Sequence, residues 1–365
     1  MTRLSKAPAS YGVSYQGSKN KIAAEVVYNI PSAPLLIDVF AGGGAITHAA
    51  LLSHRFSSIL ANDYDCGALQ LFYRASHGLI DFEEERKRWV SREDFKRLKD
   101  TDPIVRYHWS FSNNGRNYSY SKEIEPYKRA YHFARNCNDR TEWNAIGLEK
   151  FEPTRLSIRD HAEEIKDIYI RWWLKHNCYE GEIDVLKLRK NLGSLENFQS
   201  LQKLQSLGSL QRRQSLERLE KLQSLERLER LQSLQRLERL TISKADYKDI
   251  FVSEPTTVIY CDPPYINTSG YEDAIRESGF NHAEFYDWCE AQKGLVVLSE
   301  YTAPADRFTC VWSKEKKVLA GGAKHQITKV ERLFVVKGHE DDYWDLMEAH
   351  KPSTLFDLDQ RQAMI

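Results

Sequence analysis

The stretch from Leu35 to Ala45, LLIDVFAGGGA, constrains the fold more than any other part of the chain. Its first six residues are apolar apart from Asp38 and predict a buried strand. Three consecutive glycines then permit a tight turn, and an apolar-periodic helix is expected from that turn to about Phe56. A strand, a glycine turn and a helix in this order form the unit from which parallel α/β sheets are built.

Further segments have the composition of buried strands, and they lie far apart in the chain. They predict an α/β fold with a mostly parallel, Rossmann-like sheet, flanking helices and a hairpin at its edge. These segments are residues 57–65, 256–262, 294–300, 308–313 and 330–338.

Residues 75–241 do not continue this alternation and are rich in charged residues, aromatic residues and polar turns. We therefore expect a mostly helical region inserted into the sheet domain. The expected divisions are residues 1–74 with 242–340 for the cofactor-binding catalytic domain, 75–194 for the recognition insertion, 195–241 for a leucine-triplet tract and 341–365 for a C-terminal tail.

The tract repeats leucine at every third position from Leu216 through Leu240. On an α-helix this spacing carries the leucines around the axis, so it makes neither an amphipathic face nor a heptad seam. A 3₁₀-helix would align the leucines, but long 3₁₀ runs are rare. The composition favours a helix, which we expect to serve as a spacer or, through residues 195–240, as a self-association element.

Formal charge balances at 52 basic and 52 acidic residues, so any attraction for a polyanion must be local. Between Glu84 and Arg140 the chain has 14 Lys or Arg, 9 Asp or Glu and interleaved aromatic residues, a local net charge of +5. This pattern is typical of a nucleic-acid surface. A solvated helical face with ordinary core aromatics would have the same composition.

The six cysteines show no CxxC spacing, which disfavours a zinc site and a disulfide framework. A reducing cytoplasm fits this pattern. No run of about 18 apolar residues occurs, so we expect no membrane span.

The glycine turn lacks both the GxGxxG spacing and the GK[ST] ending, which disfavours a dinucleotide enzyme and a P-loop ATPase. Asp38 precedes the turn, and Asp63 follows it by roughly 20 residues, where nucleotide-binding folds place an acid for ribose hydroxyls. An adenosine-containing cofactor fits these positions. S-adenosylmethionine requires this combination, with room for its methionine part over Gly42 and Gly44.

A second chemical motif is Asp262-Pro263-Pro264-Tyr265, directly after the strand segment 256–262. Two prolines stiffen the backbone and hold a carboxylate and carbonyl oxygens as converging acceptors. Such acceptors suit an exocyclic amine, and Tyr265 could stack on a base that has been flipped out of a duplex. The plainer alternative is a polar turn. Cys261 precedes the motif on the strand, and we interpret it as a packing residue.

Several motifs together resemble those of the Dam-type N6-adenine DNA methyltransferases, particularly phage-borne members, in the order typical of that family. The segment WSFSNNGRNYSYSKEIEP, residues 109–126, also resembles the DNA-recognition hairpin region of the phage enzymes. The other motifs are YQGSK (15–19), DVFAGGGA (38–45), ND (62–63), ADY (245–247) and DPPY (262–265).

The resemblance implies an S-adenosylmethionine-dependent enzyme that methylates a flipped adenine in double-stranded DNA, in the cytoplasm of a bacterium or a phage-infected cell. It places Tyr15 and Lys19 near the cofactor and the catalytic loop. The remaining roles it implies are Phe40 and Gly42 for the methionine side, Asp63 for the ribose, Asp246 for the cofactor's adenine amine, and Asp262, Pro263 and Tyr265 for the target adenine. Pro264 completes the expected catalytic corner. In the basic aromatic insertion, the candidate DNA contacts are Asn113, Asn114, Arg116 and Lys122.

One position departs from the family pattern, because Ser299-Glu300 stands where many relatives have Ser-Asn. Two alternative functions remain open from the residues alone. One is methylation of RNA or of a glutamine side chain, whose planar amide also fits between such acceptors. The other is a catalytically idle DNA-binding or assembly protein that associates through the leucine tract.

Overall fold

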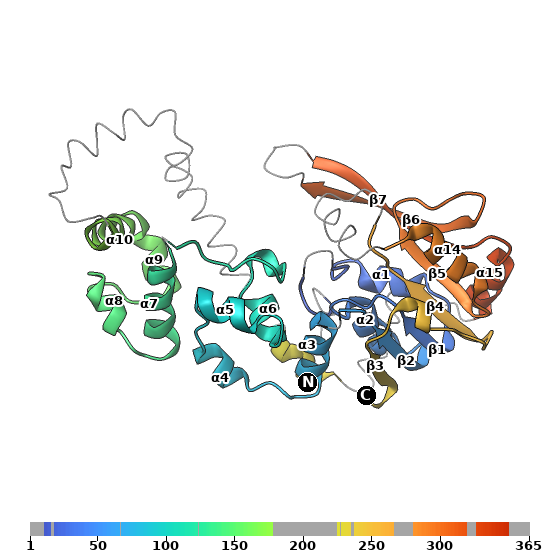
Figure 1. Ribbon diagram of the computed structural model, residues 1–365, viewed down its shortest axis with the longest axis horizontal. Coiled ribbons are helices and arrows are strands. Elements are labelled where there is room, and N and C mark those ends of the chain that lie inside the picture. Colours follow the sequence, from blue (N-terminus) through green and yellow to red (C-terminus); the bar gives the residue numbers. More distant parts are fainter. Residues whose placement is uncertain are drawn as a thin grey trace, which may run out of the picture. The chain divides into compact units, whose positions relative to one another are not determined.

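The computed structural model describes residues 11–15, 18–65, 67–122, 124–177, 225–226, 228–234, 237–265, 280–319 and 326–349. The chain divides into two compact units (Figure 1). Unit 1 comprises Met1–Gly78 and Arg230–Ile365, and unit 2 comprises Leu79–Glu229. Unit 1 includes the end of the leucine tract, which the expected divisions assigned to residues 195–241.

Unit 1 contains a seven-stranded sheet in the order β3-β2-β1-β4-β5-β7-β6. The first five strands in that order are parallel, whereas β7 runs antiparallel to both β5 and β6. The predicted α/β fold with a mostly parallel sheet and an edge hairpin is confirmed. The strands are β1 (Ala33–Asp38), β2 (Phe56–Asn62), β3 (Leu240–Ser243), β4 (Thr257–Cys261), β5 (Leu295–Glu300), β6 (Phe308–Leu319) and β7 (Gln326–Val336).

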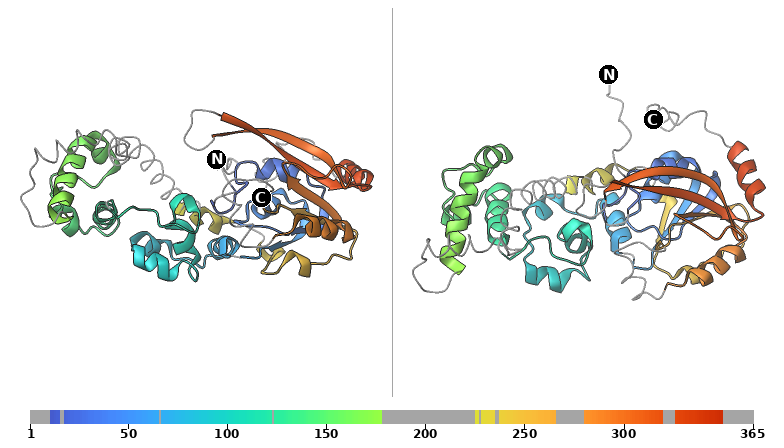
Figure 2. Two further views of the ribbon diagram at one scale, coloured as in Figure 1. Left: turned by 45° about the horizontal axis from the view of Figure 1, so that its top comes forward. Right: turned by 90° about the horizontal axis from the view of Figure 1, so that it is seen from above.

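The hairpin of β6 and β7 is longer than the parallel strands. Strand β7 pairs with β5 only from Arg332 to Val335, while it pairs with β6 as far as Gln326. The outer half of the hairpin therefore extends past the end of β5, as both views of Figure 2 show.

The central strands are buried on both faces, which explains their continuous apolar sequences. Every residue of β4 and β5 is buried. Phe285 packs with Ile37, Ile259 and Val296 in the core on one face of the sheet. The helices of this unit are α1 (Ala23–Tyr28), α2 (Ala45–Ser53), α3 (Gly67–Ser76), α14 (His282–Ala291) and α15 (Glu340–Ala349).

One sequence-based boundary in this unit was wrong. The helix after the glycine turn ends at Ser53 and not near Phe56, because His54 takes a left-handed conformation with φ 56°. Phe56 instead begins β2. The C-terminal tail expected from residue 341 begins as a helix, whose Tyr343 is buried and donates from its hydroxyl to the Asn29 carbonyl at 2.9 Å.

The end of the leucine tract is only in part a helix. Residues 225–226 and 228–230 are helical, and two 3₁₀ turns follow, η3 (Leu231–Ser233) and η4 (Leu237–Arg239). The last leucine of the repeat, Leu240, starts β3 and pairs with Ile59. This strand was missed because its signal is hidden within the repeat. The expectations of a helix and of self-association for residues 195–224 lie outside the described residues.

Unit 2 is mostly helical where the structure describes it, as expected for the insertion. One core surrounds Trp143, and another packs Phe95 against Trp109. Its elements are α4 (Phe82–Lys87), α5 (Arg92–Leu98), α6 (Pro103–His108), η1 (Phe111–Asn113), α7 (Glu125–Asn136), α8 (Thr141–Ala145), α9 (Arg155–Asp160) and α10 (Ala162–Asn177).

Helices α4, α5 and α6 begin at side-chain caps. Asp81, Ser91 and Asp102 each accept hydrogen bonds from backbone N–H groups of the first turn, which satisfies donors that the helix itself leaves unpaired. Across the described part of both units, no helix is long and apolar enough to span a membrane.

Candidate active site

The glycine turn after β1 is covered by the segment that ends at Tyr15. Val13 donates its backbone N–H to the Gly43 carbonyl at 2.7 Å. A Cβ atom added to Gly42 would lie 2.0 Å from the Tyr15 hydroxyl, and Gly42 has φ 52°. Glycine is therefore required here both for the backbone conformation and for the close approach of the ring.

Two acidic residues lie beside this turn: Asp38 is the last residue of β1, and Asp63 directly follows β2. Asp63 accepts a hydrogen bond from the Gly42 N–H through Oδ2 at 2.8 Å. Asp38 is buried, and its Oδ2 accepts from the Thr47 hydroxyl at 2.7 Å. Its other oxygen, Oδ1, is buried and has no hydrogen-bond partner among the described residues. Burial raises the pKa of Asp38 to about 7.

Asn62, which the sequence analysis named only as part of the ND motif, joins three segments at this edge. Its Nδ2 donates to the carbonyls of Val39 and Ala245 at 3.1 and 3.0 Å. Its Oδ1 accepts from the Ala245 N–H at 2.9 Å. The side chain is 1% exposed and ties the ends of β1 and β2 to the segment that precedes Asp246.

Phe40 and Asp246 come together through an aromatic contact. The Phe40 ring lies 5.8 Å from that of Tyr247, and it also meets Phe280 and Phe285. Asp246 caps η5 (Tyr247–Asp249) by accepting from the Lys248 N–H at 3.1 Å. The ADY motif is thus adjacent to the residue that ends the DVF motif, although the two motifs are far apart in the sequence.

The corner after β4 carries Asp262 next to Lys19, an arrangement that brings the first and fifth motifs of the sequence together. The Lys19 ammonium lies 3.0 Å from Asp262 Oδ1. The Asp262 side chain is 20% exposed, while that of Lys19 is 6% exposed. Asp262 lies close enough to Asp38 for its charge to contribute to the raised pKa there. The corner is therefore partly open and near the glycine turn.

The two prolines of this corner are fixed by burial of the residues around them and by a hydrogen bond to helix α14. Cys261 before them is buried in the sheet core, in agreement with its interpretation as a packing residue. Pro263 is buried. The Pro264 carbonyl accepts a hydrogen bond from His282 Nε2 at 2.9 Å, which anchors the corner to α14.

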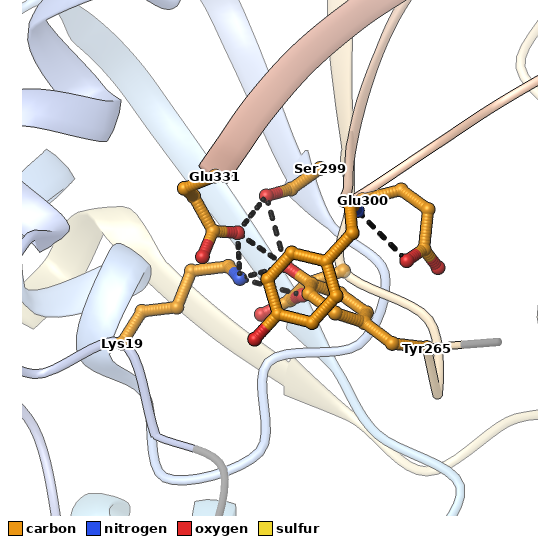
Figure 3. Close-up of polar contacts among 7 residues, drawn as sticks. Lys19, Tyr265, Ser299, Glu300 and Glu331 are labelled. Atoms are coloured by element: carbon orange, nitrogen blue, oxygen red, sulfur yellow. Dashed lines mark hydrogen bonds and ion pairs between the residues drawn. The ribbon is translucent and has the colours of Figure 1, made fainter. Parts of the chain in front are cut away.

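Glu331 of β7 is the main residue that sequence reasoning missed. Figure 3 shows it converging with Lys19, Tyr265 and Ser299. Glu331 Oε1 accepts from the Lys19 ammonium at 2.8 Å, from the Ser299 hydroxyl at 3.1 Å and from the Tyr265 hydroxyl. Lys19 also donates to the Tyr265 hydroxyl. The available signal was the charged pair Glu331-Arg332 at the start of the strand segment VERLFVV.

The charges of this cluster shift one another's pKa values in different directions. Burial raises the pKa of Asp262 to about 6 against the opposing effect of Lys19. Burial alone would lower the pKa of Lys19, but the neighbouring Asp262 and Glu331 raise it. Burial likewise opposes ionisation of Glu331, yet Lys19 and the hydrogen bonds to Oε1 lower its pKa. Of the two carboxylates, Glu331 therefore has the stronger tendency to stay ionised.

Glu300, the departure from the family pattern, is on the same strand as Ser299 but outside this cluster. Figure 3 shows its carboxylate turned away from Glu331. Its Oε1 accepts from the Tyr301 N–H at 2.8 Å, and the residue is 1% exposed.

The residues expected to contact DNA lie in and after one loop of unit 2, which a bridge between Ser110 and Tyr118 closes. Asn114 Oδ1 accepts from the backbone N–H groups of Arg116 and Asn117 at 2.9 and 3.0 Å, so this oxygen shapes the loop. Asn113 has φ 54° and is half-buried, whereas the side chains of Arg116 and Lys122 are exposed.

Comparison with known families gives a match over the first part of the chain. The model of the D12 class N6 adenine-specific DNA methyltransferases matches residues 15–168. The matched range begins at Tyr15, includes the glycine turn and the unit 2 loop, and ends before Asp262. None of the curated proteins compared matches the chain. The family match confirms the resemblance seen in the motifs: over residues 15–168 the chain is similar to a family of enzymes, the D12 class N6 adenine-specific DNA methyltransferases.

Proposed function

We propose that the protein transfers a methyl group from S-adenosylmethionine to N6 of an adenine flipped out of duplex DNA. The observation that carries this proposal is the corner after β4, where the partly exposed Asp262 lies beside Lys19 at the same sheet edge as the glycine turn. Ligands of open α/β sheets bind at the carboxyl ends of the strands, so a cofactor over the turn would lie next to this corner.

The residues around the glycine turn fit S-adenosylmethionine. Oδ1 of Asp38, which has no hydrogen-bond partner among the described residues, suits a cationic amino group. Because Gly42 has no side chain, the Tyr15 ring can close over the turn where the cofactor would bind. Asp63 would hold the ribose hydroxyls. Phe40 would line the methionine side, and Asp246 would accept from the adenine amine. When bound, the cofactor supplies an electrophilic methyl group.

The corner would activate the target amine. The adenine N6 lone pair is conjugated with the ring, which makes the amine a poor nucleophile. Hydrogen bonds from its N–H groups to Asp262 and to a carbonyl near Pro263 would favour a tetrahedral nitrogen and free that lone pair. Tyr265 would stack on the base and recover part of the few kcal/mol that base flipping costs. Such positioned acceptors act without a covalent enzyme intermediate.

Unit 2 would supply the DNA contacts. The exposed Arg116 and Lys122 suit phosphate oxygens, while the amide of Asn113 and the Nδ2 group of Asn114 can read base edges. A short adenine-containing duplex site is the expected substrate, and the cytoplasm, where DNA and the cofactor meet, is the expected compartment.

The full chain should methylate adenine in plasmid DNA from a methylation-free host when S-adenosylmethionine is added. Sequencing of the modified DNA measures this activity and gives the site. Methylation of structured RNA or of a glutamine-containing protein, with none on duplex DNA, would contradict the proposal. Failure to bind the cofactor in calorimetry would favour an idle DNA-binding protein.

Asp262→Asn should lower kcat at least about 100-fold, because a neutral amide cannot replace an ionised acceptor aimed at developing positive charge. Cofactor affinity should stay near that of the wild type. Since Asp262 must be ionised, wild-type kcat/KM should fall as pH drops below the pKa of about 6. A variant that methylates at the wild-type rate would refute the assigned role.

A further inference from the structure

Glu331 lies where β7 passes beyond the end of β5. Arg332 is the last residue of β7 to pair with β5, and its partner is Glu300. The next residue outward, Glu331, projects to the opposite face because side chains alternate along a strand. Arg332 donates to the Tyr301 carbonyl, which fixes β7 at this position.

Three side chains donate hydrogen bonds to one oxygen of Glu331, and all three lie at or beside the corner after β4. Glu331 is 3% exposed, so these donors replace water as its hydrogen-bond partners. The contacts come from Lys19, Tyr265 and Ser299, three segments that are not neighbours in the sequence. A buried carboxylate with three donors is held rigidly, and its removal leaves those donors unpaired at a large cost in stability.

Two carboxylates flank one buried ammonium, an arrangement that neutralising Lys19 alone would not require. If Asp262 were its only partner, turning Asp262 towards a substrate amine would leave the Lys19 charge buried and unpaired. Removing the partner of a buried charge is strongly destabilising. Glu331, whose carboxylate lies 2.8 Å from the Lys19 nitrogen, keeps the ammonium paired when Asp262 turns towards the substrate.

We propose that Glu331 is a positioning residue that keeps Lys19 paired while Asp262 accepts hydrogen bonds from the target amine. This inference rests on the proposed methyl transfer to adenine. Glu331 also orients the stacking residue, because it accepts the Tyr265 hydroxyl while the Lys19 nitrogen lies 4.6 Å from the Tyr265 ring centroid.

The test compares Glu331→Gln with Glu315→Gln in the full chain, on unmethylated plasmid DNA. Gln keeps an acceptor oxygen at position 331 but removes the charge. We expect kcat to fall about 10- to 100-fold, with S-adenosylmethionine affinity unchanged. Glu315 is an exposed residue of the same hairpin, and its loss should leave kcat unchanged. Equal kcat values for the two variants would overturn the proposal.

The pH profile separates positioning from general structural support. The charge of Glu331 contributes to the raised pKa of Asp262, so its loss should move the acidic limb of kcat/KM to lower pH. A variant that is merely destabilised would lose activity with its acidic limb unmoved, and this result would also overturn the proposal. Glu331→Asp retains the charge and should keep the limb near the wild-type position.

A double-mutant cycle with Lys19→Met keeps the proposal testable if Glu331→Gln folds poorly. If Glu331 acts through Lys19, the double variant should be no less active and no less stable than Lys19→Met alone. Additive losses would refute that route. Absence of adenine methylation by the wild-type chain would instead refute the proposed function, so the two failures are distinguishable.

Discussion

At the scale of single residues, the site depends on two kinds of constraint. Glycines allow backbone and rings to approach closely at the turn, and buried charges compensate one another at the corner. The first is visible in the sequence, because three adjacent glycines directly after an apolar strand indicate a tight turn with close backbone approach. The second is not, because Lys19 and Glu331 are 312 positions apart and only folding brings them together.

Gly44→Ala should destabilise unit 1 by about 2–4 kcal/mol, from left-handed backbone strain and from overpacking. Gly44 has φ 69°, and an added Cβ would lie 2.9 Å from the Phe72 ring. Gly78→Ala is the matched control: its φ is 67°, but nothing lies within 4 Å of an added Cβ. It should cost about 1–2 kcal/mol. Thermal unfolding of both variants measures the difference, and equal losses would exclude a packing contribution from Phe72.

At the scale of elements, the site is built from strand ends and the segments that follow them. Strands β1, β2 and β4 each deliver an acid at one edge of the parallel sheet, since the carboxyl ends of parallel strands lie on the same side. Strand β7, which runs antiparallel to β5, places Glu331 beside Lys19 at this edge. A sequence can indicate that a hairpin follows β5, but the register of its strands decides which residue reaches the corner.

Asn62→Ala should lower the free energy of unfolding by about 3 kcal/mol, because each buried polar group left unpaired costs about 1–3 kcal/mol. The change would release the carbonyls of Val39 and Ala245 and the Ala245 N–H. As a control, Asn29→Ala removes one partly buried hydrogen bond to the Glu25 carbonyl and should cost about 1 kcal/mol.

Urea unfolding of the two asparagine variants, followed by cofactor titration, provides the measurement. A small loss at position 62 would mean that water replaces the amide at the junction. The segment before Asp246 should also loosen, so S-adenosylmethionine affinity should decrease in Asn62→Ala and stay unchanged in Asn29→Ala.

At the scale of the whole molecule, a sheet unit with the candidate active site and a mostly helical unit are encoded in one interrupted chain. Formal net charge is zero, so the molecule as a whole exerts little pull on DNA. The proposed DNA binding must then depend on a small number of local cations. The slope of affinity against salt concentration measures how many of them contact phosphates.

The double variant Arg116→Ala/Lys122→Ala should reduce the log–log salt slope of DNA binding by about 1.8, since each phosphate contact contributes about 0.9. Arg159→Ala removes an exposed cation from the same unit, on α9, and should leave the slope unchanged. Fluorescence anisotropy at several salt concentrations measures both. An unchanged slope in the double variant would mean that these two side chains do not contact phosphates.

The sequence by itself determined the parallel sheet, the glycine turn, the stiff corner at Asp262 and the helical character of the insertion. These features follow from local composition and period, which act over a few residues. Only the tertiary structure decided that Leu240 begins a strand, that Asn62 joins three segments and that Glu331 shares Lys19 with Asp262. Such outcomes depend on strand register and on contacts between distant segments, where burial and charge pairing outweigh the preferences of any single stretch of chain.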